Sequence, residues 1–138
     1  MANIKVVKQY IKNLSIKVPN SPQVFINNQN KPDIEIAIDL DAKKISDFAY
    51  EVILQIKINA NGGRLFECST NYAGIFTLKN NDENFEEKLL VDCPNLLFPF
   101  CRNIISNLTS DAGFAPLMLD PIDFESLYLK RKESIIVN

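Results

Sequence analysis

Apolar and polar residues alternate along four stretches in the first part of the chain. A period of two is typical of strands that bury one face. The stretches cover Tyr10–Val18, Asp33–Asp41, Phe48–Ala60 and Arg64–Leu78. The connections between the last three are short, and the Asn-Gly-Gly sequence at 61–63 is a tight-turn signal. The pattern therefore predicts a four-stranded antiparallel sheet.

After the fourth stretch the apolar spacing changes to three and four residues, as on one face of a helix. This face carries Leu97, Cys101, Ile104, Ile105 and Leu108. We expect the regular part of the helix to begin around Pro99, because a helix tolerates proline only near its start. It should end at Ser110–Asp111, where Gly113 supplies a left-handed stop.

Shorter helices are predicted on both sides of the long one. An acidic helix, roughly Glu83–Val91, precedes it, and a loop with several prolines follows it. A second helix should begin at Ile122, since Asp120 before a proline and Asp123 in the first turn favour a helix N-terminus. The order predicts an α+β fold, a four-stranded antiparallel sheet followed by a long helix and a short C-terminal helix. We expect residues 1–138 to form one domain.

Two groups of apolar residues are not accounted for by the core of such a fold. Val24, Phe25 and Ile26 stand in a loop rich in Asn, Gln and Pro. Either they fold back under the loop as a small cluster, or they line a surface that binds something apolar. The long helix also carries Phe98 and Phe100 beyond its stripe, so we expect self-association to cover the excess. A core formed within one chain is the other interpretation.

Composition limits the chemistry that the chain can perform. With 46% hydrophobic and 23% charged residues, the 138-residue chain has a globular composition. It contains no histidine, so a Ser/His or Cys/His catalytic pair is excluded within one chain. Cys68, Cys93 and Cys101 form no Cys-x-x-Cys pair, and we interpret them as small buried residues. We therefore expect no enzymatic activity, no metal and no cofactor.

Hydropathy and charge bear on location and partners. No apolar run approaches the ~18 residues of a membrane span, and the N-terminus lacks the apolar region of a secretory signal. We therefore expect a cytoplasmic protein without direct membrane insertion. The net charge is −2, and the first 31 residues contain lysines but no acidic residue. Basic residues are not interleaved with aromatic ones, so nucleic acid is not an expected partner.

Several blocks of the sequence resemble the SecB family of protein-export chaperones. The blocks are YIKNLSIKVPNSPQVF at 10–25, CSTNYAGIFTL at 68–78, CPNLLFPFCRNIISNL at 93–108, GFAPLMLDPIDF at 113–124 and the ending FESLY at 124–128. They occur in the family's order and with its spacing, so the resemblance extends over nearly the whole chain.

The resemblance implies a tetramer, a dimer of dimers, that holds secretory precursors unfolded and passes them to the SecA translocation ATPase. The residues that it implies for the oligomer interface are Cys68, Thr70, Tyr72, Leu97, Cys101, Ile104, Ile105 and Leu108. The residues that it implies for a hydrophobic client-binding groove are Val24, Phe25, Ile26, Ile34, Ile36, Ile38, Phe124, Leu127 and Tyr128. No nucleotide, metal or covalent step is implied.

The family contacts the ATPase through acidic residues on the outer face of its first and last strands. The matching positions in this chain are Asn13, Lys17, Glu67 and Ser69, of which Glu67 alone is acidic. The altered charges at the other three leave open a SecB-like chaperone that is dedicated to one partner, such as a toxin–antitoxin component. A small-molecule-binding α+β domain is the third hypothesis.

Overall fold

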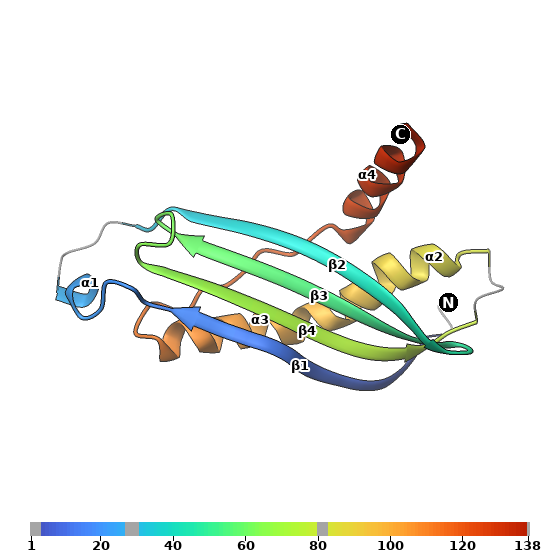
Figure 1. The fold of residues 1–138 in the computed structure, drawn as a ribbon, viewed down its shortest axis with the longest axis horizontal. Coiled ribbons are helices and arrows are strands. Elements are labelled where there is room, and N and C mark those ends of the chain that lie inside the picture. The colour runs from blue at the N-terminus through green and yellow to red at the C-terminus, as the bar shows by residue number, and fades with distance from the viewer. Residues whose placement is uncertain (1–3, 27–30, 80–82, 138) are drawn as a thin grey trace.

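The four predicted strands form one antiparallel sheet in the computed structural model, which describes residues 4–26, 31–79 and 83–137. Across the sheet the strand order is β1-β4-β3-β2 (Figure 1). The bounds are Lys5–Lys17 for β1, Ile34–Ser46 for β2, Ala49–Ala60 for β3 and Phe66–Thr77 for β4. The predicted fold class is confirmed, and β1 and β2 are the two edge strands.

The strand β1 begins five residues earlier than its alternation predicts, at Lys5 instead of Tyr10. The register between β1 and β4 shifts between Val6 and Lys8 and again between Ile11 and Asn13. Each shift is a bulge that places one extra residue on β1 and breaks the period of two. The alternation in the sequence is therefore lost in the part of the strand that lies before the second bulge.

Three helical segments follow the sheet and run on continuously, namely α2 at Phe85–Glu87, a π-helical turn (η1) at Lys88–Asp92 and α3 at Cys93–Asp111. The helix α3 packs against β3 and β4 on one face of the sheet (Figure 1). Leu54, Ile56, Leu97 and Ile105 are fully buried in this contact layer. Full burial of each such side chain stabilises the fold by roughly 1.5–3 kcal/mol.

The helix α3 begins at Cys93, not around Pro99 as we predicted. Pro99 lies inside the helix, where its missing N–H leaves the carbonyl of Asn95 without its helical partner. Both residues are exposed, so water can satisfy that carbonyl. The predicted end is confirmed: α3 stops at Asp111, Gly113 has φ +98°, and the Phe114 N–H bonds to the Thr109 carbonyl at 3.1 Å.

An extended connection leads from α3 to the last helix, α4, at Phe124–Val137. The buried Thr109 hydroxyl donates to the Ile105 carbonyl at 3.0 Å and accepts the Leu117 N–H at 2.9 Å, which ties the connection to α3. The helix α4 begins two residues later than predicted, after Asp123, whose carboxylate accepts the Ser126 N–H at 3.0 Å. No helix of the described residues is both long and apolar enough to cross a membrane.

Candidate functional site

A pocket of ≈560 Å³ opens at the end of the sheet beside α1, a single helical turn at Gln23–Ile26. Three aromatic rings of its lining pack together at tilted angles, with the Phe114 centroid 5.2 Å from that of Phe25 and 4.9 Å from that of Phe66. The complete lining is Val24, Phe25, Lys31, Pro32, Ile34, Leu65, Phe66, Gly113, Phe114, Ala115, Pro116 and Leu117. We call this the aromatic pocket.

The three apolar residues at 24–26 divide between the two roles that the sequence left open, a buried cluster and a binding surface. Val24 is buried and anchors α1 to the core, whereas Phe25 is 47% exposed and lines the aromatic pocket. Ile26 is 71% exposed and lies outside the pocket lining. The Phe25 ring rests against Gly113, since a Cβ added to that glycine would lie 2.8 Å from the ring.

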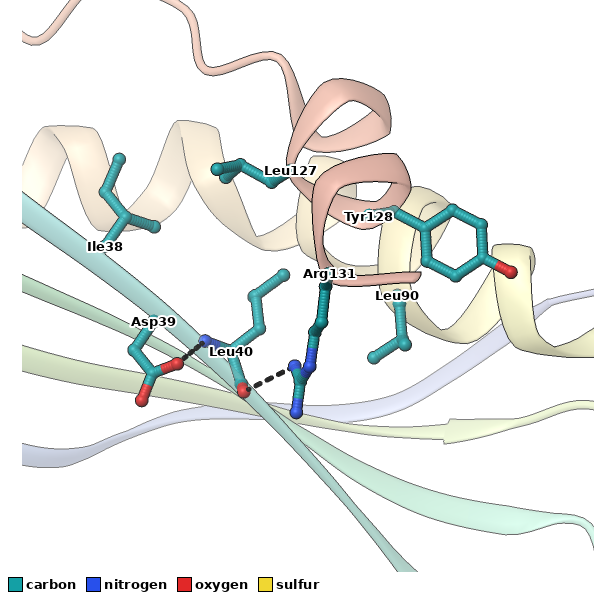
Figure 2. A pocket seen from close by; sticks show the side chains of 7 residues that line it. All are labelled: Ile38, Asp39, Leu40, Leu90, Leu127, Tyr128 and Arg131. Atoms are coloured by element: carbon teal, nitrogen blue, oxygen red, sulfur yellow. Dashed lines mark hydrogen bonds between the residues drawn. The ribbon is translucent and has the colours of Figure 1, made fainter. Parts of the chain in front are cut away.

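A second, smaller pocket of ≈120 Å³ lies between β2 and α4 (Figure 2). Ile38 and Leu40 reach it from β2, Leu90 from η1, and Leu127, Tyr128 and Arg131 from α4, with Asp39 completing the lining. Arg131 donates a hydrogen bond to the Leu40 carbonyl at 3.3 Å, and the Asp39 carboxylate accepts the Leu40 N–H at 2.9 Å. We call this the α4 pocket.

The strand β2 connects the two pockets. Ile34 lines the aromatic pocket and Ile38 the α4 pocket, while Ile36 lies between them on the same strand face and is 46% exposed. Together the two pockets and Ile36 form what we call the β2 apolar surface. It combines exposed apolar side chains with the free edge of a strand.

The β2 apolar surface contains most of the predicted groove residues. Six of them line a pocket, namely Val24, Phe25, Ile34, Ile38, Leu127 and Tyr128. Phe124 is a correction, because it is 1% exposed and its ring packs 6.1 Å from that of Phe98. Its place at the start of α4, over the long helix, makes it a core residue of the protomer.

Sequence reasoning missed several residues of this surface. Phe66 follows the ordinary alternation of β4, and Leu90 belongs to the acidic helical segment, so neither stands out. Phe114 and Leu117, by contrast, are apolar residues in a proline-punctuated loop. This is the same signal that drew attention to Phe25, and it could have identified them.

The predicted interface residues lie mostly inside the protomer. Cys68, Thr70, Tyr72, Leu97, Cys101 and Ile105 are all buried between α3 and the sheet, and only Ile104 and Leu108 are partly exposed. In the single protomer the chain's own helix covers these strand positions, and their role at an oligomer interface stays a prediction. Burial raises the pKa of the Cys68 thiol to about 11 and those of Cys93 and Cys101 to about 12, so the three are neutral at pH 7.

Other apolar side chains remain exposed beside that layer. Phe100 on α3 stacks over Tyr72 with ring centroids 6.4 Å apart, and Leu96 lies one helical turn before it. On the same side of the edge strand β1, Val6, Ile11 and Leu14 are exposed opposite Phe76, Tyr72 and Thr70. We call these five exposed residues of β1 and α3 the β1–α3 apolar strip.

The four positions predicted for an ATPase contact lie together on the outer face of the sheet, opposite α3. Lys17 pairs with Glu67, Asn13 with Asn71, and Ser15 with Ser69 across β1 and β4. A shallow pocket of ≈240 Å³ includes Lys17, Glu67 and Ser69 together with Lys57 of β3. The structure thus brings the predicted positions together, with two lysines beside the single acid.

Comparisons with known proteins agree with this architecture. The profile of the family described as preprotein translocase subunit SecB matches residues 1–134. The protein-export protein SecB of Paramagnetospirillum magneticum is 44% identical over 134 residues, which are 95% of this chain and 86% of that protein. The protein-export protein SecB of a Bradyrhizobium species is 43% identical over 133 residues, 94% of this chain and 82% of that protein.

A solved structure shows the same fold. It is a SecB-like chaperone of Mycobacterium tuberculosis in complex with a peptide from an antitoxin. Its TM-score to this chain is 0.62, with 16% sequence identity over 86% of this chain and 87% of that one. At that identity the likeness concerns the fold alone.

Proposed function

The chain belongs to the SecB family and is a protein-export chaperone, and we propose that it holds unfolded secretory precursors on the β2 apolar surface before it delivers them to the SecA ATPase. We take residues 1–138 as one chaperone domain. Because a chaperone that holds precursors before export must meet them before they cross the membrane, we place it in the cytoplasm.

The observation that carries the holding mechanism is the exposure of apolar side chains on the edge strand β2 and on α1 beside it. Phe25 and Ile36 are about half exposed in the free protomer, next to pockets that can take further apolar side chains. Burial of a client side chain there is driven by the hydrophobic effect, which does not depend on direction or sequence. Such a surface would promote aggregation in a protein without clients.

We propose self-association as a dimer of dimers, with the β1–α3 apolar strip as one of its interfaces. Phe100, Ile11 and Leu14 are exposed in one protomer, and they lie on an edge strand and the helix next to it. Symmetric pairing of two such strips buries both at once, which is the usual route to closed homo-oligomers. We propose that this strip, with Ile104 and Leu108 at its side, forms the exposed part of the interface next to the buried residues of α3 and β4.

Delivery to SecA is proposed for the outer-face cluster. Asn13, Lys17, Glu67 and Ser69 are neighbours across β1 and β4, as one contact site requires. Lys17 lies opposite Glu67, so the local charge differs from that of an all-acidic patch. A partner that binds here must supply an acidic group for Lys17 or leave that lysine in water.

The alternatives receive no comparable support. The export proteins from several organisms are about 40–44% identical to this chain, whereas the chaperone bound to an antitoxin peptide shares 16%. A small-molecule site would need converging polar groups. The aromatic pocket has Lys31 as the single charged residue of its lining. SecB is a chaperone family and not a family of enzymes.

The test is the aggregation of a urea-denatured secretory precursor after dilution into buffer, followed by light scattering. We expect suppression when the chaperone is equimolar with the precursor, and capture of the precursor in a complex on size-exclusion chromatography. Unchanged aggregation would contradict the proposed function. Binding of SecA to the same complex is then measured separately.

A further inference from the structure

The backbone of β2 directs alternate residues toward β3 and toward open space. Its register with β3 runs without interruption from Ile34–Ala60 to Lys44–Tyr50. In an antiparallel ladder each residue points both its N–H and its C=O to the same side. The Asn61 N–H bonds to the Asp33 carbonyl at 2.8 Å, so odd-numbered residues face β3 and even-numbered residues face outward.

Two outward-facing residues of β2 are closed to any further strand. The Leu40 N–H bonds to the Asp39 carboxylate at 2.9 Å, and the Leu40 carbonyl accepts the Arg131 guanidinium at 3.3 Å (Figure 2). The Ala42 N–H likewise bonds to the carboxylate of Asp41 at 3.0 Å. The chain therefore satisfies both outward groups of Leu40 and the outward N–H of Ala42 by itself.

The same edge is open closer to the start of the strand. Ile36 and Ile38 also face outward, and none of the hydrogen bonds among residues 4–26, 31–79 and 83–137 reaches their outward N–H or C=O. The opposite edge, β1, is protected differently, by two bulges and by exposed lysines such as Lys5 and Lys8. Bulges and charged side chains are the usual means by which edge strands avoid pairing.

We infer that an extended client segment adds to β2 as a further strand over Ile34–Ile38, and that Arg131 and Asp39 end this pairing at Leu40. The inference rests on the proposed function and names the geometry of client binding. Strand addition explains how clients of any sequence bind, since main-chain hydrogen bonds are common to all polypeptides.

The two pockets fit such a strand. Ile34 belongs to the aromatic pocket and Ile38 to the α4 pocket. These residues are four positions apart, or about 13 Å along a strand. Alternate side chains of the added strand point to the same face as the isoleucines. A client segment with apolar residues at positions i, i+2 and i+4 therefore fills both pockets and covers Ile36.

Residue-resolved amide hydrogen exchange tests the inference directly, with reduced, carboxymethylated α-lactalbumin as a permanently unfolded client. The Ile36 and Ile38 amides should exchange at least about tenfold more slowly in the complex, because each gains a hydrogen bond. The amides of Ala37 and Asp39, which already face β3, should change little. Binding without slower exchange at Ile36 and Ile38 would overturn strand addition and leave the proposed function intact. Absence of binding would remove both.

Ile36→Pro and Ile36→Ala form a matched pair of variants. Both remove the isoleucine side chain, but only proline removes the outward N–H, and it removes no hydrogen bond to β3. We expect Ile36→Pro to bind the client at least about threefold more weakly than Ile36→Ala. Equal affinities, with both variants folded by circular dichroism, would overturn the inference.

The closing role of Arg131 has its own measurement. In the double variant Arg131→Ala/Asp39→Ala, the Leu40 edge is free, so client binding should also slow exchange at the Leu40 amide. Arg131→Lys keeps a cationic donor and serves as the control. Protection that still ends at Ile38 in the double variant would show that these residues do not limit the added strand.

Discussion

Tyr10 on β1 donates its phenolic hydrogen bond to Glu51 on β3, across the strand β4 that separates them. Lys12 on β1 donates to the other oxygen of the same carboxylate at 2.9 Å. Glu51 is buried, although it lies on the outer face of the sheet, which no described helix covers. The three side chains fasten the bulged part of β1, where the ladder with β4 is irregular.

We predict that Glu51→Gln lowers the free energy of unfolding at pH 7 by about 1.5–3 kcal/mol, because hydrogen bonds to a charged group are lost. The bonds from Tyr10 and Lys12 lower the pKa of Glu51, so its contribution is present at neutral pH and is lost as the pH falls through that lowered pKa. Urea unfolding between pH 2 and 7 measures both effects. Asp47→Asn, at an exposed pair with 3.7 Å to Lys44, is the control and should change stability little.

At alkaline pH the stability that Tyr10 contributes should change in the opposite direction, decreasing as the pH rises. Burial and the bond to Glu51 raise the pKa of Tyr10 to about 12. Its contribution is therefore fully present below the ordinary tyrosine pKa of about 10 and is lost as the pH rises toward 12. Tyr10→Phe should remove this alkaline dependence. An unchanged pH profile in both variants would contradict the proposed role of the cluster.

The sequence predicts a strand or helix best when a single packing partner determines which of its residues are buried. β3 and β4 alternate cleanly because α3 covers one of their faces along their length, and the end of α3 follows from the local requirement for φ +98° at Gly113. The starts of β1 and α3 were wrong for specific reasons. Bulges interrupt the alternation of β1, and Pro99 is tolerated inside α3 because its unpaired carbonyl partner faces water.

The site was predictable where a residue contradicts its surroundings and not where it agrees with them. Phe25 stands out in a polar loop, whereas Phe66 is hidden in the regular alternation of β4. Alternation also cannot distinguish a position covered by the chain's own helix from one covered by a second protomer. The resemblance to the SecB family implies an interface role for Thr70 and Tyr72, and in the protomer α3 of the same chain buries both.

Gly113→Ala should weaken both stability and client binding. The residue has φ +98°, and an added Cβ would lie 2.8 Å from the Phe25 ring, so the ring must shift from its position in the aromatic pocket. We expect a loss of about 1–3 kcal/mol from the strained backbone alone. Gly62→Ala is the matched control, because Gly62 has φ +65° and nothing lies within 4 Å of the added atom. Chemical unfolding and client affinity should separate the two: equal effects on affinity would show that the Phe25 contact does not matter.

The double variant Ile11→Asp/Phe100→Asp should dissociate the oligomer. Both residues are exposed on the β1–α3 apolar strip, so the protomer should remain folded, whereas a buried unpaired charge at an interface costs several kcal/mol. Multi-angle light scattering should give a tetramer for the unmodified protein and a smaller species for the variant. Met118→Asp, at another exposed apolar residue, should leave the mass unchanged. A variant of unchanged mass would exclude this strip as the interface.

Lys17→Glu should strengthen binding to SecA by about 1 kcal/mol, or roughly fivefold, because it restores an acid beside Glu67 at an exposed site. Lys5→Glu makes the same charge change on the same strand, but at the position opposite Thr77, away from the cluster. Titration by isothermal calorimetry at low and physiological salt compares the two variants. Should both strengthen binding equally, net charge and not the outer-face cluster governs the contact.

The double variant Phe25→Asp/Ile36→Asp tests whether clients bind the β2 apolar surface. Both side chains are about half exposed, so the changes should leave fold and oligomer intact. Full burial of one such side chain against a client contributes roughly 1.5–3 kcal/mol, so the double variant should bind an unfolded precursor at least about tenfold more weakly.

Ile26→Asp introduces the same charge in the same loop at a residue that lines neither pocket, and it should bind clients almost normally. Phe124→Asp, by contrast, should unfold the protein, because that ring is 1% exposed. Precursor affinity is measured by fluorescence anisotropy, with circular dichroism and light scattering for fold and mass. A folded, tetrameric double variant with unchanged affinity would show that clients bind elsewhere, since two half-exposed side chains of the β2 apolar surface would then contribute nothing.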